Sequence, residues 1–594
     1  MGSQLKDALK AKGIFPSQKN KDGMSDKAKS THAKSLEIEP LKTKTDRVIH
    51  DRPPKKRNPG KNQSKHNAEV QRKQLQQDLE KLHGAYSRSQ KGKSSTASTS
   101  KEKTLPVASV IREGKFSPHP LLTRQVDVRH VRKTSLHNGI ARQIATSPNA
   151  AADLVLGLDF GTSSVKAVIR DHAANIAFAV PFTTDDLNPY LLPSRVWKTD
   201  EVYSLDSGSA IRADLKLGLL SCQAVSPVDE FNDACAFLAL VIRHSRGWFF
   251  DTYGPRYARH ALSWRINLGL PARSYEDERS VDLFRRLAWA AANCASDKTG
   301  QITSAMIDKY RKLSIDVFDN ANPPDDLEFY PEDADVIPEI AAQVFGFVQS
   351  ERWNWRQRPM MMMVDVGAGT VDAAFFSIVK EGNRLSFNFF SDDVQQAGVM
   401  NLHRKRVEWL RRVFSDSGVC DNDISQFLDE TAGSTDHLGP LPGSVLDYVN
   451  GYRIEIPPGC ETADSEFFKK QYSPQVFRCI RGAREVGVPD TQLNNLPFFL
   501  CGGGSRMHIY SEVIELINDA NINVNVVEES IPIPAELVAE SLPVADYDRL
   551  SVAYGLSRQG AGGRPLGDYV RTIDIPQVTK SEASDYTDRY IEQP

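Results

Sequence analysis

Cysteine pairs and long apolar runs are both missing from this sequence. Its 594 residues include only seven cysteines, none of them in a C-x-x-C pair, which argues against a disulfide framework or a cysteine zinc site and is typical of a reducing compartment. No stretch approaches the roughly 18 to 20 apolar residues that span a bilayer, and the N-terminus lacks the apolar core of a signal peptide. We therefore expect a cytoplasmic protein without a transmembrane segment.

Apolar and aromatic residues are scarce at the N-terminus, where Phe15 and Tyr86 are the only aromatic residues in the first hundred. Lys, Ser, Gln, Asn and Thr dominate instead, and such a segment cannot bury enough apolar area to offset an ordering entropy of roughly 1 to 2 kcal/mol per residue. We predict that residues 1–105 form a disordered basic arm. One helix is expected inside it, over residues 67–86, either docked on a partner or transient and solvated.

Positive charge is concentrated in the N-terminal quarter of the chain. Residues 1–150 contain 32 lysines and arginines against 13 aspartates and glutamates, whereas the remainder contains 42 against 63. A flexible lysine-rich segment binds nucleic acid or an anionic surface through counterion release, and the scarcity of aromatic residues makes such binding non-specific. The arm is equally compatible with a localisation tag or a solubilising tail.

Strands and helices alternate from about residue 153 onward, which is the pattern of an α/β fold. The stretches 154–168 and 362–376 share a layout of strand, D-x-G-x-x turn and strand, which indicates two similar halves. The predicted parts are a basic linker that wraps or flanks the core (106–152), a first lobe (153–355), a second lobe (356–562) with a variable insertion for a protein partner (416–497), and a flexible C-terminal tail (563–594).

Two turns carry more polar residues than a plain hairpin needs. The residues concerned are Asp159, Gly161, Thr162 and Ser163 in the first turn, and Asp365, Gly367, Ala368, Gly369 and Thr370 in the second. Glycine lets backbone N–H groups approach an anion, and a carboxylate at the end of a buried strand needs a cation such as hydrated Mg²⁺. Each turn predicts a phosphate site, although either one alone is also typical of a structural hairpin.

A third glycine-rich turn follows another apolar strand. The turn contains Gly502, Gly503, Gly504, Ser505 and Arg506, and a helical segment comes after it. Bare backbone lets a flat ligand lie close to the chain, and the start of a helix favours negative charge. An ordinary strand-to-helix turn is the alternative interpretation.

The three turns, in this order, resemble those of the actin-like ATPase superfamily, most closely the nucleotide-binding domain of the heat shock 70 kDa (DnaK-type) chaperones. The most specific stretch is D-x-G-x-G-T-x-D at Asp365–Asp372, and the likeness covers about residues 153–562. Two further segments are similar to the connecting helices of that family: "DADVIPEIAAQVFGF", with Glu339, and "DYDRLSVAYGLSRQG", with small Ala553 and Gly555 at a close helix crossing. The resemblance implies a two-lobed fold of duplicated ribonuclease H-like domains.

The resemblance also implies a role for each motif residue in binding ATP or ADP with Mg²⁺. Asp159 and Asp365 would hold Mg²⁺ through water, and with Glu339 and Thr370 they would form the catalytic set, Glu339 orienting the attacking water. The nucleotide-binding residues would be Gly161, Thr162, Ser163, Gly367, Ala368, Gly369, Gly502, Gly503, Gly504, Ser505 and Arg506.

Three departures from the family pattern are visible. Ala368 replaces the middle glycine of the second turn, and the lysine that these chaperones place on the γ-phosphate has two candidates, Lys198 and Lys216. Loss of that charge would slow hydrolysis more than binding. Only about 30 residues follow the second connecting helix, too few for the peptide-binding domain of a chaperone.

The sequence therefore predicts an ATP-binding, slowly hydrolysing nucleotide switch whose lobe closure regulates a protein partner. One alternative is an actin-like filament-forming ATPase, in which nucleotide-bound subunits stack head to tail. A second alternative is a small-molecule kinase of the sugar type, because the stretch "GLDFGTSSVKAVI" alone also resembles those enzymes.

Overall fold

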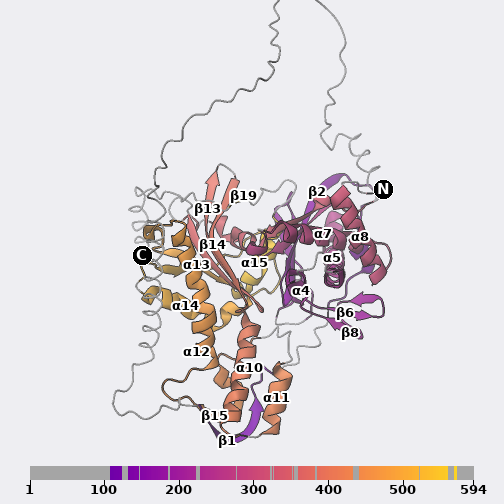
Figure 1. Cartoon of the computed structure of the whole chain (residues 1–594). Coiled ribbons are helices and arrows are strands. Elements are labelled where there is room, and N and C mark those ends of the chain that lie inside the picture. The colour runs from indigo at the N-terminus through magenta and orange to yellow at the C-terminus, as the bar shows by residue number, and fades with distance from the viewer. Residues whose placement is uncertain are drawn as a thin grey trace, which may run out of the picture. The chain divides into compact units, whose positions relative to one another are not determined.

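The structure is a computed structural model that describes residues 108–558 and 568–570, with internal gaps (Figure 1). The gaps are 124–130, 146, 185–187, 222–227, 276, 321–323, 325–326, 351, 354–358, 382–383, 420, 433–439 and 521. The predicted arm (1–105), its helix (67–86) and most of the predicted tail (563–594) lie outside the described residues. Among the helices of the described part, none is long and apolar enough to cross a membrane.

The first large sheet has the strand order β11-β9-β2-β3-β4-β18, with β5 beside β3. Its strands are β2 (Ala150–Phe160), β3 (Ser164–Asp171), β4 (Ile176–Ala179), β5 (Leu192–Pro193), β9 (His260–Leu270), β11 (Ala334–Pro338) and β18 (Leu537–Val538). β2 is antiparallel to β3 and parallel to β9. The chain enters β2 three residues before the predicted boundary, because Ala150 to Leu158 continue the ladder with β9.

The second large sheet has the order β17-β16-β12-β13-β14-β19. Its strands are β12 (Met360–Val366), β13 (Val371–Glu381), β14 (Arg384–Gln395), β16 (Leu496–Cys501), β17 (Val526–Glu528) and β19 (Asp568–Val570). Each sheet thus contains a run of five strands in which the first two form a hairpin, the third adds antiparallel, and the fourth and fifth add parallel on the other side. The predicted mixed α/β class is confirmed, and the strand order occurs twice.

Helices pack around the first sheet because their apolar faces match its buried strands. They are α3 (Leu136–Ile140), α4 (Leu215–Ser221), α5 (Val228–Tyr257), α6 (Ala272–Tyr275), α7 (Glu278–Ser296) and α8 (Ser304–Asn320). A small sheet beside them has the order β10-β7-β6-β8. Its strands are β6 (Val196–Thr199), β7 (Val202–Ser204), β8 (Ala210–Arg212) and β10 (Ile302–Thr303).

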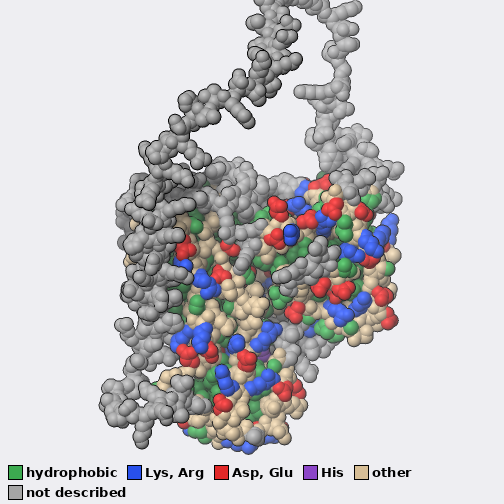
Figure 2. Space-filling view, in the orientation of Figure 1, with side chains coloured by type: hydrophobic (Ala, Val, Ile, Leu, Met, Phe, Trp, Pro, Cys, Tyr) green, Lys and Arg blue, Asp and Glu red, His purple; other side chains and the backbone are tan. Residues whose placement is uncertain are grey.

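On the face in Figure 2, basic and acidic side chains are interspersed.

Two helices, α9 (Glu339–Val348) and α15 (Asp548–Leu556), cross closely. A Cβ atom at Gly555 would overlap the carbonyl of Ala342, so only glycine fits this crossing. The carbonyl of Ala553 faces Gly157 of β2, where a Cβ atom would also collide with it. Of the two small residues expected at the crossing, Gly555 therefore contacts α9 and Ala553 contacts the first sheet.

We expect Gly555→Ala to lower the free energy of unfolding by roughly 1 to 3 kcal/mol, because backbone cannot move aside as a flexible side chain does. Gly346→Ala, in α9, is the matched control, since a Cβ atom there meets the Tyr547 hydroxyl at 3.2 Å and Ile531 at 3.5 Å. Chemical denaturation of both variants checks the prediction. Equal stability of the two variants would contradict it.

A separate unit follows strands β12, β13 and β14 of the second large sheet. Its elements, and those that lead back to the sheet, are α10 (Val399–Asp416), α11 (Asn422–Ala432), β15 (Val449–Glu455), α12 (Ala463–Phe467), α13 (Ser473–Glu485) and α14 (His508–Asp519). The apolar cluster of this unit draws on α10, α11 and β15, whereas α13 packs on β13 and β14. Beyond β14, the apolar cluster of this unit starts in α10, ahead of the predicted insertion (416–497), and its last buried member, Ala463, lies before the end of that insertion.

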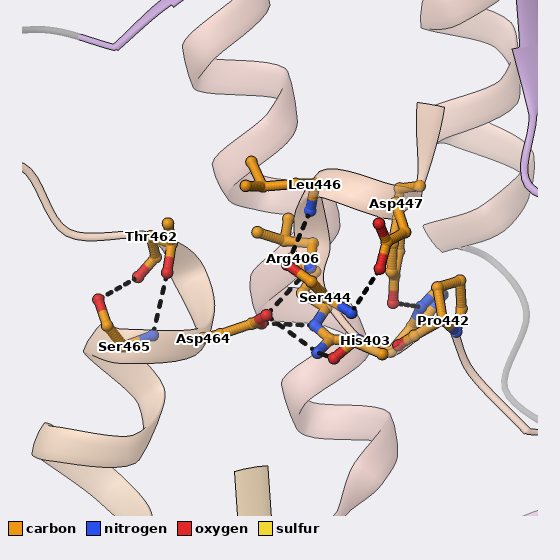
Figure 3. Close-up of polar contacts among 12 residues, drawn as sticks. His403, Arg406, Pro442, Ser444, Leu446, Asp447, Thr462, Asp464 and Ser465 are labelled. Carbon is orange, nitrogen blue, oxygen red and sulfur yellow. Dashed lines mark hydrogen bonds and ion pairs between the residues drawn. The ribbon is translucent and has the colours of Figure 1, made fainter. Parts of the chain in front are cut away.

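A buried arginine ties this unit together (Figure 3). Arg406 of α10 is fully buried and binds both carboxylate oxygens of Asp464 at 2.5 and 3.0 Å. It also donates to the carbonyls of Pro442 at 2.7 Å and Gly443 at 2.9 Å. Because a buried charge is tolerated only when it is paired and hydrogen-bonded, these contacts hold α12 and the 442–443 loop on α10.

The segment that precedes β2 contacts both halves of the molecule, and we call residues 108–123 and 131–149 the N-terminal strap. In the strap, β1 (Ser109–Pro118) pairs antiparallel with β15. Farther along the strap, the backbone N–H of Ser135 donates to Asp251 of α5 at 2.8 Å. The strap is therefore part of the folded structure at two separate places.

Candidate functional site

A cavity of about 350 Å³ lies between the two sheets and is lined from both halves. Of the predicted site residues, its lining includes Asp159, Gly161, Thr162, Ser163, Glu339, Asp365, Gly367, Ala368, Thr370, Gly502, Gly503 and Gly504. Gly369, Ser505 and Arg506 are not among the lining residues. The structure thus brings together all three glycine-rich turns, which lie far apart in the sequence.

The first two turns have the same backbone geometry. In the turn after β2, the N–H of Gly161 donates to the carbonyl of Ser164 at 3.2 Å. In the turn after β12, the N–H of Gly367 donates to the carbonyl of Thr370 at 2.9 Å. Asp159 and Asp365 therefore occupy equivalent positions, each two residues before the glycine that starts its turn.

The two turns lie close together in the wall of the cavity. A Cβ atom at Gly369 would lie 3.4 Å from the methyl group of Thr162. On its far side the second turn is held by the start of α10, where the N–H of Met400 donates to the carbonyl of Ala368 at 2.8 Å. Ala368 keeps this turn intact despite replacing the expected glycine, and it lines the cavity.

The third turn lies against the carboxylate of Asp365. Gly502 has a φ of 82°, and a Cβ atom there would overlap Asp365 Oδ1 and approach the carbonyl of Val366 to 2.6 Å. Gly504 packs on Val366 and Val399 with no space for a side chain. Glycine is required at both positions, by close approach at each and by the left-handed backbone at Gly502.

The side chains at the end of the third turn do not line the cavity. Arg506 contacts Asp546 at 2.7 Å and Asp548 at 2.8 Å, because these carboxylates beside the start of α15 outcompete solvent for the guanidinium. Ser505 Oγ donates to the carbonyl of Gly502 at 2.8 Å and so closes its own turn. Asp548 and Arg549 line the cavity instead; both lie in the stretch identified as similar to the second connecting helix, to which the sequence analysis assigned no site residue.

Buried carboxylates dominate the electrostatics of the cavity. Burial, followed by repulsion from Asp159 and Glu339, raises the pKa of Asp365 to about 7. Burial, followed by repulsion from Glu339 and Asp365, raises the pKa of Asp372 to about 8. Burial also raises the pKa of Glu339, although Lys216 opposes that shift. The cavity therefore favours a cation, which would stabilise these carboxylates in their ionised form.

Two lysines reach the cavity. Lys216 of α4 is only 3% exposed, and its Nζ contacts Glu339 Oε1 at 2.5 Å. Lys166 of β3 contacts Asp159 Oδ2 at 3.0 Å. The other candidate, Lys198 of β6, lies outside the lining and contacts Glu201 at 3.8 Å. The sequence analysis left the choice between Lys198 and Lys216 open and missed Lys166, which the hairpin register opposite Asp159 could have indicated.

Within the part of the chain that the structure describes, no group of three or more His, Cys, Asp or Glu side chains is arranged to hold a metal ion. One polar atom is nevertheless left over: Asp372 Oδ1 is buried and has no hydrogen-bond partner among the described residues. The bound waters of a hydrated cation would fit this acceptor, because Mg²⁺ usually keeps several waters that can donate hydrogen bonds.

Neither the models of known protein families nor the curated proteins include a match to this chain. The functional conclusion therefore rests on the geometry and charge of the cavity.

Proposed function

We propose that this protein is an ATP-binding nucleotide switch of the actin-like ATPase superfamily, closest to the nucleotide-binding domain of the heat shock 70 kDa chaperones. The observation that carries the proposal is the convergence of three glycine-rich turns and two equivalent aspartates, Asp159 and Asp365, on one cavity. A polyphosphate needs such closely approaching backbone and a partly hydrated cation.

The strand topology supports the proposed two-lobed fold of duplicated ribonuclease H-like domains. The same five-strand order occurs in both large sheets, and each first hairpin contributes its turn to the cavity. α9 and α15 cross closely beside this cavity. A ligand that contacts both hairpin turns would favour the closed arrangement of the halves, since differential contact is what shifts such an equilibrium.

The residues present fit a magnesium-bound nucleotide. Asp159 and Asp365 would hold Mg²⁺ through water, and the ion would neutralise phosphate charge. The N–H groups of Gly161 and Gly367 close their own turns, so the backbone N–H groups that follow them in each turn, together with the Thr370 hydroxyl, would bind the phosphates. Gly502, Gly503 and Gly504 would contact the adenosine. Arg506 is assigned a structural role, because it is held by Asp546 and Asp548.

Lys216 and Glu339 are the two side chains that we propose to act in slow ATP hydrolysis. In this proposal Lys216 would contact the terminal phosphate, and Glu339 would orient the attacking water. The two side chains bind each other at 2.5 Å, so they lie close enough to act on the same end of a ligand. We propose that a protein partner reads the resulting closure, and that the basic arm contributes a second, salt-sensitive contact to nucleic acid or an anionic surface.

Calorimetric titration of the full chain with ATP and ADP, with and without Mg²⁺, tests the proposal. We expect Mg²⁺-dependent binding in the wild type. Lys216→Met is expected to slow single-turnover hydrolysis by roughly 10- to 100-fold with a smaller effect on affinity, because lost electrostatic stabilisation acts mainly on the transition state. Lys198→Met, which removes a lysine outside the cavity, is the matched control.

Three results would contradict or redirect the proposal. A wild type that binds neither nucleotide would overturn it. Light scattering that rises only with ATP would favour the filament alternative, and ATP consumption that requires an added hydroxyl acceptor would favour the kinase alternative.

A further inference from the structure

One buried polar side chain in the cavity has no part in the roles described above. Gln343 of α9 is only 1% exposed and lines the cavity. Its Oε1 atom is buried and has no hydrogen-bond partner among the described residues. The neighbouring α9 residues Ala341, Ala342 and Val344 are buried and apolar, so a polar side chain here is an exception within its own helix.

An unpartnered amide oxygen is costly to keep in this position. Leaving a buried acceptor without a donor destabilises the protein, whereas an apolar side chain of similar shape would carry no such penalty. A donor inside the cavity would remove that penalty. Phosphate oxygens are acceptors and cannot supply it, so a water molecule is the natural donor on the phosphate side.

Gln343 is also correctly spaced to share that water with Glu339. The two residues are four apart on α9, and such pairs lie on one helix face with Cβ atoms roughly 5 to 6 Å apart. A water that donates one hydrogen bond to each acceptor, at about 2.8 Å, needs acceptors roughly 4 to 5 Å apart. Both O–H groups of that water would then point toward α9, and its lone pair would point away.

We propose that Gln343 is a positioning residue for ATP hydrolysis, an inference that rests on the proposed function. Gln343 Oε1 and Glu339 accept the two hydrogen bonds of the attacking water. The water oxygen forms a bond to the γ-phosphorus, and the bond from that phosphorus to the β–γ bridging oxygen breaks. The electron pair of the broken bond leaves with ADP, and the water proton passes to Glu339 before it leaves with the products.

The test separates nucleotide affinity from hydrolysis in the full chain. Gln343→Met keeps the length of the side chain and removes the acceptor. We expect the dissociation constant for Mg-ATP to stay within about twofold and single-turnover hydrolysis to fall by roughly 100-fold, the lower end of the range for groups that assist proton transfer. Gln349→Met is the matched control, because Gln349 is the exposed C-cap residue of the same helix.

A second variant keeps the inference falsifiable should Gln343→Met perturb folding, which its melting temperature reports. Gln343→Glu retains an acceptor and adds a negative charge, so we expect its hydrolysis rate to exceed that of Gln343→Met while its affinity for ATP falls. Unchanged hydrolysis in Gln343→Met would overturn the inference. So would an equal loss of affinity and rate, which would make Gln343 a nucleotide contact.

The outcome for the wild type distinguishes the two proposals. If the wild type binds Mg-ATP and never hydrolyses it, the nucleotide site stands and the role of Gln343 is wrong. If the wild type binds no nucleotide, both the proposed function and this inference fail.

Discussion

Asp365→Asn is expected to weaken Mg²⁺-dependent nucleotide binding while making the nucleotide-free protein more stable. Asp365 is buried beside Asp159 and Glu339, and its pKa is raised to about 7. Without a cation beside it, this negative charge lowers the free energy of unfolding, and the isosteric amide removes the charge. With magnesium bound, the same charge holds the hydrated ion, and even outer-sphere partners contribute roughly 10- to 100-fold to metal affinity.

The stability gain has a defined pH dependence. A carboxyl whose folded pKa lies above its unfolded value of 3.8 destabilises the folded state increasingly as pH rises from about 4 to about 7. The gain from Asp365→Asn should therefore be absent near pH 4 and reach roughly 2 to 4 kcal/mol above pH 7. Denaturant unfolding across this pH range measures it.

Asp335→Asn is the matched control for Asp365→Asn. Asp335 lies on β11, is partly exposed and contacts Arg285 at 3.2 Å. This variant should leave both nucleotide binding and the pH profile unchanged. Loss of stability in Asp365→Asn at pH 7, or retained magnesium-dependent affinity, would show that Asp365 is not a charge held for a cation.

Removal of residues 1–123 should unfold the unit built on α10, α11 and β15, whereas removal of residues 1–105 should not. β1 is the only strand that pairs with β15 among the described strands. The strap also contributes Ala108, Val110, Phe116 and Leu122 to the apolar cluster of this unit. Loss of these contacts should cost roughly 3 to 6 kcal/mol, at about 25 cal/mol per Å² of apolar area.

Hydrogen exchange of residues 449–455 in the two truncated chains measures this effect. Point variants refine it, because Phe116 packs 5.7 Å from the ring of Phe427, whereas Ile111 on the same strand is 37% exposed. Phe116→Ala should destabilise the unit and Ile111→Ala should have little effect. Equal exchange protection in both truncated chains would mean that the strap rests on the unit without supporting it.

The strap shows where sequence analysis stopped short. Residues 106–152 were predicted to be a basic linker that wraps or flanks the core, since their apolar residues have no helical or strand period. β1 forms because β15 offers an unpaired edge, and that edge lies more than 300 residues away in the sequence. Pairing over such a separation leaves no local signal.

Some cavity residues could be recognised from local sequence, whereas others depend on contacts between distant segments. The backbone of a glycine-rich turn is dictated locally, so the three turns could be recognised in the sequence. Arg506 was predicted to contact a nucleotide, and the direction of its side chain in the structure depends on Asp546 and Asp548, which reach it from the segment that begins α15. Lys216 could be named only as one of two lysines, since the position of α4 relative to α9 decides the choice.

The sequence by itself determined the α/β class, the three turns and the two aspartates that end buried strands, because hydrophobic period and glycine content act over a few residues. Only the tertiary structure decided that these turns line one cavity, that Lys216 contacts Glu339, that Gln343 Oε1 has no hydrogen-bond partner among the described residues, and that β1 pairs with β15. These are contacts between distant segments, and they depend on how buried surfaces match after the chain has folded.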